Sequence, residues 1–275
     1  MKNVTYIIPL HEYNDTVAEY LGKAYESLKP NLQKGDVVAF VGPQAVIDKA
    51  AEPFNTGKTK AVKLFYNEEK TDFFSQVNKA VMFCTTDFFS VLEYDDEYLP
   101  NWGVNGRLYS GNGASIVLPI AVIKDAKGIL QDRYCNEIAL STIFKQDAYD
   151  KAEDRELDNE ILPIGFVTKK GLDAYMDFQV TGGFIKTEDF IAIGGLKPSL
   201  KVAAWYEFLL RCVYNKKRIY VAPKLGYRHL VGREGSYTDT AYKEIGQEVG
   251  AWFIETARQE YFFKEDRNKV FGKEE

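Results

Sequence analysis

Apolar runs of strand length alternate with segments of helical periodicity through the first hundred residues, and this order restricts the fold more than any other feature. Each of the first three apolar runs is followed by a segment whose apolar residues recur at helical spacing. Such an order is typical of a mostly parallel sheet with helices on both faces. The predicted strands comprise residues 4–10, 37–41, 61–66 and 88–92.

Polar residues mark where the intervening helices are expected to begin. Thr16 and Glu19 have the spacing of a capping box, which predicts that the first helix begins there. The second helix is predicted over residues 44–51, directly after a Gly-Pro turn. Thr71 or Asp72 can accept a hydrogen bond from the first turn of the third helix.

The rest of the chain alternates less regularly. A strand is predicted within residues 114–123, and the polar stretch 131–159 is predicted to be an exposed helical insertion or loop. The remaining predictions are a strand at 178–185 interrupted by two glycines, helices at 187–193 and 205–214, a short strand at 218–221, a mobile loop at 232–240 and a helix at 241–263.

The charge and the cysteines limit the classes of function and location. A formal net charge of −5 argues against broad binding to nucleic acid through phosphates, although a local basic groove is still compatible with it. The three cysteines, Cys84, Cys135 and Cys212, are isolated in the sequence, so we expect reduced thiols. No apolar segment approaches the length of a membrane span, and the first ten residues do not resemble a signal peptide. We therefore expect a soluble cytoplasmic protein, of a bacterium or of a phage in its host.

An acidic segment directly follows the fourth predicted strand. Glu93, Asp95 and Asp96 lie where that strand ends, and ligands of such sheets bind beyond the carboxyl ends of the strands. Clustered carboxylates suit a hard divalent cation, Mg²⁺ or Mn²⁺, that bridges to substrate phosphates. The acidic run taken alone fits a solvated acidic turn better, so the prediction of a metal site depends on its context.

Four segments in matching order supply that context. Together they make the chain resemble the family 2 nucleotide-sugar glycosyltransferases from about residue 4 to about residue 230. The matching segments are Y-I-I-P-L at residues 6–10, S-Q-V-N-K-A at 75–80, L-E-Y-D-D-E-Y-L-P at 92–100, and T-G-G-F at 181–184 with F-I-A-I-G-G-L at 190–196.

The resemblance implies a fold and a division of the chain. The expected fold is GT-A, a Rossmann-like α/β fold with a mixed, mostly parallel sheet flanked by helices. Residues 1–110 would form the nucleotide-sugar-binding half. Residues 111–240 would form the acceptor-binding half, with an insertion around 131–160, and residues 241–275 would form a C-terminal helical segment.

The resemblance also assigns roles to particular residues. Asp95, Asp96 and His229 would hold the metal ion, although a lone histidine is more often a packed or surface residue. Glu93 stands where the family usually has aspartate, near the ribose and the metal. The residues expected to bind the nucleotide sugar are Pro9, Leu10, His11, Glu12, Asn78 and Glu93, with Arg228 and Arg233 on its phosphates.

The general base of the family has no direct counterpart in this chain. The family has a Glu-Asp pair at the start of a helix, where this chain has Ala204 and Trp205. Glu207 keeps its chemical type and is our candidate for the base that deprotonates the acceptor hydroxyl. An ion pair between Glu207 and Arg211 at i+4 is an equally good interpretation. In that case the base would come from elsewhere, with Glu234 and Asp239 as candidates.

The function that follows is metal-dependent, inverting glycosyl transfer from a nucleoside diphosphate sugar, a UDP-sugar in the first place. The acceptor would be a glycan, with a modified base of phage DNA as a minority interpretation. A non-catalytic sugar-nucleotide-binding or scaffold protein on a degenerate GT-A fold is the alternative. A nucleotidyltransferase ranks last, because residues 11–16 contain no glycine. The sequence leaves the oligomeric state open, a homodimer included.

Overall fold

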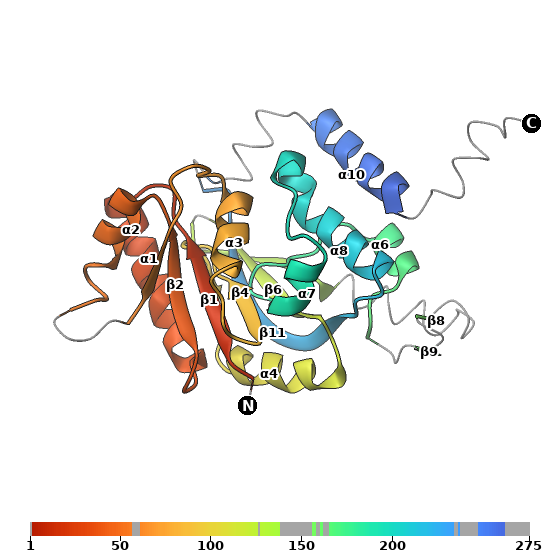
Figure 1. Cartoon of the computed structure of the whole chain (residues 1–275), viewed down its shortest axis with the longest axis horizontal. Coiled ribbons are helices and arrows are strands. Elements are labelled where there is room, and N and C mark those ends of the chain that lie inside the picture. The colour runs from red at the N-terminus through yellow and green to blue at the C-terminus, as the bar shows by residue number, and fades with distance from the viewer. Residues whose placement is uncertain are drawn as a thin grey trace, which may run out of the picture.

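A mixed β-sheet forms the centre of the molecule (Figure 1). The computed structural model describes residues 2–56, 61–125, 127–137, 156–157, 160–161, 165–233, 236 and 247–261. The strand order is β3-β2-β1-β4-β10-β6-β11-β5, and β7 pairs with β6 beside β10. The strands are β1 (Val4–Pro9), β2 (Val37–Gly42), β3 (Lys63–Tyr66), β4 (Phe88–Val91), β5 (Glu97–Tyr98), β6 (Ile116–Asp125), β7 (Leu130–Cys135), β10 (Phe184–Lys186) and β11 (Ile219–Val231), and the short β8 (Glu156–Leu157) and β9 (Glu160–Ile161) pair separately.

The predicted α/β fold is confirmed, with a parallel part and a mixed part. β3, β2, β1 and β4 are all parallel neighbours, as the alternating order of strands and helices predicts. β10 is antiparallel to both β4 and β6, and it joins the first half of the sheet to the second. β11 is parallel to β6 along its length, and on its other side it pairs with the antiparallel edge strand β5.

Helices cover both faces of this sheet, and each face has its own apolar core. The side chains of Tyr6 and Ile8 in β1 pack on one face with α1 (Asp15–Leu28), α2 (Gln44–Ala51) and α4 (Trp102–Tyr109). Ile7 points to the other face, in the alternation that a strand imposes. That face is covered by α3 (Phe73–Val81), α6 (Lys169–Ala174), α7 (Thr187–Ala192), α8 (Ala204–Tyr214) and α10 (Gln247–Tyr261).

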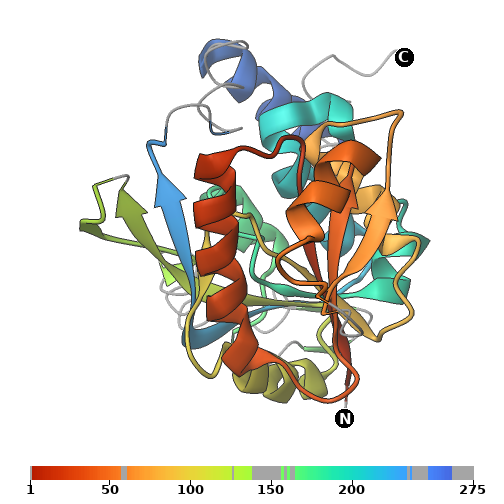
Figure 2. The ribbon, with the colours of Figure 1, turned by 90° about the vertical axis from the view of Figure 1, so that its left-hand side faces the viewer.

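Short 3₁₀ turns and a long hairpin complete the fold. The turns are η1 (Lys29–Asn31), η2 (Ser110–Asn112) and η4 (Pro198–Ala203). Figure 2 shows the hairpin of β6 and β7 reaching outward beside the end of β11, with α1 in front of the sheet. Within the described part of the chain, no helix combines the length and the apolar character that crossing a bilayer needs.

Several predicted boundaries were wrong, each for a local reason. The cap of α1 is Asn14, whose side chain accepts the Val17 N–H, so the helix begins before the Thr16 capping box. Part of the stretch predicted as a helical insertion or loop forms β7, because its residues pair with the long strand β6. Most of that stretch lies outside the described residues.

Two strands within the predicted acceptor half also differ in length from their predictions. β10 is much shorter than predicted, since the chain turns at Val180–Gly183 before the strand begins. β11 is much longer than predicted, since irregular pairing between Val221 and Tyr227 lets it pass Pro223 and continue along β6. This extension of β11 carries His229 to the acidic segment.

Candidate metal and nucleotide site

The acidic segment begins where β4 leaves the sheet. The Leu92 N–H still donates to the Ile7 carbonyl of β1 at 2.9 Å, and the chain then bends away. The Asp96 N–H donates back to the Glu93 carbonyl at 3.0 Å, which closes a turn over Glu93–Asp96. The turn puts three carboxyl side chains at the end of the parallel strands, where the topology predicts a ligand site.

The end of β11 meets this turn from the other half of the molecule. Asp96 is fully buried, and its two carboxylate oxygens both contact β11. Oδ1 accepts the Leu230 N–H at 2.8 Å, and Oδ2 lies 3.0 Å from Nδ1 of His229. Asp96 thus holds both the Leu230 backbone and the His229 imidazole. The carboxylate that fixes the position of His229 would also bind the same metal ion.

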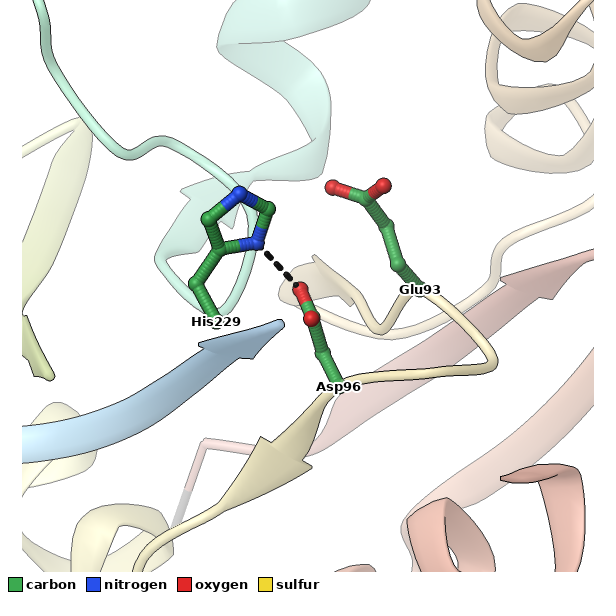
Figure 3. A group of neighbouring side chains, drawn as sticks. All are labelled: Glu93, Asp96 and His229. Atoms are coloured by element: carbon green, nitrogen blue, oxygen red, sulfur yellow. Dashed lines mark hydrogen bonds and ion pairs between the residues drawn. The ribbon is translucent and has the colours of Figure 1, made fainter. Parts of the chain in front are cut away.

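Glu93, Asp96 and His229 form one compact group (Figure 3), here called the carboxylate–histidine cluster. Each residue offers one ligand atom, and these atoms all lie within 4.8 Å of one another. Figure 3 shows the Glu93 carboxylate and the imidazole facing each other above Asp96. Two carboxylates and an imidazole thus face a common space, in which a metal ion could bind to all three.

The electrostatics of the cluster favour the protonated forms of Glu93 and His229. Burial and the neighbouring Asp96 charge raise the pKa of Glu93 to about 8. Burial opposes the charged form of His229, but Asp96 and Glu93 outweigh it and raise the pKa of the imidazole to about 9. The group therefore retains protons near neutral pH, and a bound dication would displace them.

A close approach of Tyr227 supports the backbone below Glu93. The Glu93 N–H donates to the Tyr227 hydroxyl at 3.3 Å. The Tyr227 ring lies against Gly182, where a Cβ atom would come within 2.3 Å of it, and Gly182 also has a φ of 82°. Only glycine meets both demands, which gives the Gly-Gly segment a structural reason. Nothing in the hydrophobic pattern singles out Tyr227, and sequence reasoning missed it.

Asp95 is turned away from the cluster. Its Oδ2 accepts a hydrogen bond from Nε of Arg233 at 2.6 Å, and the guanidinium also bonds the Tyr94 hydroxyl at 2.8 Å. Burial and the Asp96 charge raise the pKa of Asp95, and Arg233 opposes that rise. Of the three predicted metal ligands, Asp96 and His229 lie together, while Glu93 stands where Asp95 was expected.

The two predicted phosphate-binding arginines are already ion-paired. Arg228 donates to Glu97 at 2.5 Å, and Arg233 is held by Asp95. Both guanidinium groups lie beside the acidic turn, so a phosphate would have to replace or share these carboxylates. Their contact with the nucleotide sugar remains a prediction.

The predicted nucleotide loop lies after β1. Pro9 and Leu10 are buried, and the Leu10 backbone bonds to Val41 and to the Gln76 side chain. His11 and Glu12 are about half exposed, with side-chain exposures of 50% and 48%. The His11 ring centre is 6.3 Å from that of Tyr94, which places the loop beside the acidic turn. The binding of a base here remains a prediction.

Asn78 has the contacts of a structural residue. Its amide nitrogen donates to the Leu196 carbonyl at 2.9 Å, and its oxygen accepts the Leu196 N–H at 2.8 Å. It also packs against Gly195, where a Cβ would lie 2.7 Å from the amide oxygen. These bonds clamp the Gly194–Gly195 turn onto α3 and leave little of the amide for the predicted cofactor contact.

Glu207 forms the ion pair with Arg211 that was the alternative to a role as general base. Its side chain is fully buried in α8, 2.9 Å from Arg211 and 3.0 Å from Lys197, and it accepts the Tyr261 hydroxyl at 2.5 Å. Three donors thus occupy the carboxylate. This geometry argues against a general base, a role that remains an untested prediction. Glu234 and Asp239 lie outside the described residues.

Comparison with known proteins shows the fold. No family model matches the chain, and no curated protein matches it. The structure of S. aureus TarS, residues 1–349, matches with a TM-score of 0.58 at 14% identity, over 100% of this chain and 76% of that one. TarS in complex with UDP-GlcNAc matches with a TM-score of 0.57 at 15% identity, over 100% of this chain and 77% of that one. TarS is a family 2 glycosyltransferase of the GT-A fold.

Proposed function

Starting from the GT-A fold that this chain shares with TarS, we propose that it transfers a sugar from a nucleoside diphosphate sugar to an acceptor hydroxyl. The observation that carries the proposal is the carboxylate–histidine cluster, whose three ligand atoms converge within 4.8 Å at the end of the parallel strands. A UDP-sugar is the first donor to test, because a relative in fold has been solved with UDP-GlcNAc. A glycan is the preferred acceptor, with a modified DNA base as the minority alternative.

The donor atoms of the cluster fit Mn²⁺ better than Mg²⁺. Two carboxylates suit either ion, but an imidazole ligand is less favourable for Mg²⁺, which prefers an all-oxygen shell. The raised pKa of Glu93 reflects burial and the repulsion from Asp96, and a dication would relieve that repulsion. When bound, such an ion offsets negative charge on a departing diphosphate.

The residues around the cluster have separate tasks in this proposal. Asp96 positions His229 and the end of β11 through its two carboxylate oxygens. Arg233, held by Asp95 and Tyr94, is placed to exchange the carboxylate for a phosphate oxygen. His11 and Glu12, exposed after β1, would contact the nucleoside. Residues 1–110 and 111–240 remain our proposed donor and acceptor halves, with 241–275 as a C-terminal segment.

Binding without transfer is a second candidate function that two observations favour. The position where the family has its Glu-Asp pair carries Ala204 and Trp205, and Trp205 packs against Phe74 and Phe208. Glu207, the nearest carboxylate on α8, is saturated by Arg211, Lys197 and Tyr261. A protein with this helix would bind a nucleotide sugar and lack the usual means of deprotonating an acceptor.

A direct experiment measures Mn²⁺-dependent binding and turnover of UDP-sugars. Calorimetry should show tight UDP-GlcNAc binding with Mn²⁺ and weak binding with EDTA. Asp96→Asn should greatly weaken the metal dependence, while Glu52→Gln, which changes an exposed carboxylate where α2 ends, should leave it intact. Hydrolysis or transfer by the wild-type protein supports the enzyme, and tight binding with no turnover supports the binding protein. If Mn²⁺ changes neither binding nor stability, both versions of the proposal fail.

A further inference from the structure

A second polar pocket lies on the other side of the acidic turn from the carboxylate–histidine cluster. Its lining comes from α1, the acidic turn, β5 and the ends of β6 and β11. Here we call it the cationic pocket. It is lined by Tyr20, Lys23, Asp95, Glu97, Lys124, Arg228 and Leu230.

The charges in this pocket leave an excess of positive charge. The two carboxylates each have a close cation, Arg233 for Asp95 and Arg228 for Glu97. Lys124 forms no ion pair with any residue that the structure describes, although it is half-buried at the end of β6. An unpaired ammonium group beside neutralised carboxylates attracts an anion in a protein whose net charge is otherwise −5.

Two further groups in the pocket are poorly satisfied. Nε of Arg228 is buried and has no hydrogen-bond partner, although Nη1 of the same guanidinium bonds Glu97. A buried donor without a partner is costly, so a full set of hydrogen bonds does not hold this guanidinium in its present position. Lys23 is 56% exposed, and among the described residues its one ion pair is with exposed Glu19, so it can turn to a ligand at little expense.

The sheet register explains why this pocket is separate from the metal cluster. Along β11, successive side chains point to opposite sides, so Arg228 and Leu230 line the pocket while His229 joins the cluster. Asp95 lines the pocket and Asp96 belongs to the cluster, one residue apart on the turn. A group bound in the pocket would therefore lie beside the proposed reaction site without sharing its ligands.

We propose that the cationic pocket binds one oxyanion, a phosphate ester or a carboxylate, carried by the acceptor. That the anion belongs to the acceptor rests on the proposed function. That the pocket binds an anion rests on the pocket alone. Lys124, Lys23 and Arg228 supply the donors, and the excess of one positive charge matches a single anionic group. The acceptor of this protein is accordingly an anionic molecule whose hydroxyl lies near the charged group.

The test measures anion binding with the full chain, in EDTA and at low ionic strength, so that no metal recruits the ligand. Inorganic phosphate and acetate are titrated separately by calorimetry, and the tighter of the two identifies the anion. Lys124→Ala and Lys23→Ala should each weaken binding at least fivefold. Lys127→Ala removes an exposed lysine from the same hairpin outside the pocket and should change nothing. Glu97→Gln removes a competing charge and should strengthen binding.

Two results would overturn the inference. One is the absence of both phosphate and acetate binding in the wild-type protein. The other is binding that Lys124→Ala and Lys23→Ala leave unchanged while both variants melt like the wild type. The proposed function is tested separately by UDP-GlcNAc with Mn²⁺. Loss of that binding with lysine-dependent anion binding intact removes the transferase and leaves the pocket, and the reverse result removes the pocket alone.

Discussion

Two buried carboxylate sites of this molecule differ in how their charge is compensated. Glu207 is fully buried and contacts Arg211, Lys197 and the Tyr261 hydroxyl, so its charge is satisfied from within the chain. Asp96 is as deeply buried, but its charge is balanced by a titratable imidazole, that of His229, beside a second carboxylate, Glu93. A carboxylate held by permanent cations supports the fold, whereas one balanced by a titratable neighbour is available to a metal ion that displaces the proton.

The Glu207 site connects several elements of the second half. Arg211 also donates to the carbonyls of Ile193 and Gly195, at the end of α7. Tyr261 belongs to α10, which thereby docks on α8. A single carboxylate thus fixes the helix start where the family has its base, the turn after α7 and the last described helix.

The largest effect is expected when the compensated site is broken. Glu207→Ala would leave Arg211 and Lys197 buried or half-buried without their partner, and should lower the free energy of unfolding by roughly 3–5 kcal/mol. Denaturation in urea measures it, with Glu255→Gln on the exposed face of α10 as control. Glu207→Gln keeps the shape of the side chain. If Glu207→Gln leaves the stability unchanged but removes transfer, that result would support Glu207 as the general base.

The Asp96 site should lose metal binding more than stability. Asp96→Asn keeps an oxygen for the Leu230 N–H but removes a metal ligand and one charge of a repelling pair. We expect Mn²⁺ affinity to fall by at least about 10- to 100-fold, the loss caused by removing even an outer partner of a metal ligand. Stability in EDTA near pH 7 should fall by about 1–3 kcal/mol, less than for Glu207→Ala, because His229 can release its proton when its partner is lost. Calorimetry with Mn²⁺ and thermal melts in EDTA measure the two quantities. A large loss of stability with unchanged Mn²⁺ affinity would make Asp96 another structural carboxylate.

A smaller and more discriminating effect separates Glu93 from Asp95. The structure puts Glu93 in the cluster and Asp95 on Arg233, so Glu93→Gln should weaken Mn²⁺ binding far more than Asp95→Asn. We expect roughly tenfold or more for the first and less than about threefold for the second. The family resemblance predicts the reverse order. Equal losses would mean that Asp95 leaves Arg233 when the metal binds.

The smallest expected effect is on the pH dependence of the metal-free protein. The folded pKa of His229, about 9, lies above its ordinary value of 6.5, so its stabilising contribution is complete below 6.5 and disappears as pH rises through 9. The pKa of Glu93 rises from 4.5 to about 8, so its ionisation also costs stability over that interval. In EDTA the melting temperature should fall by several degrees between about pH 6 and 9. Asp96→Asn should flatten the curve, and an unchanged slope would contradict the assignment.

The sequence alone was sufficient for the local elements of the first half. The helix predicted over residues 44–51 matches α2, and Asp72 caps α3 as one of the two predicted candidates. These features depend on caps and apolar periods within a few residues, which are visible in a linear pattern. The position of the acidic turn at the end of β4 followed from the same alternation, since parallel strands end on one edge.

Only the tertiary structure decided which carboxyl groups work together. Whether Asp95 or Glu93 joins Asp96 depends on Arg233, which lies 138 residues from Asp95 and competes for it. The hydrogen bonds of the Glu207 carboxylate include one from Tyr261, which lies 54 residues away on α10. The sequence predicts this helix from its apolar period but does not show where it packs. Burial and partners are set by packing of distant segments, so the sequence could name the acidic residues but could not divide them between ligand binding and support of the fold.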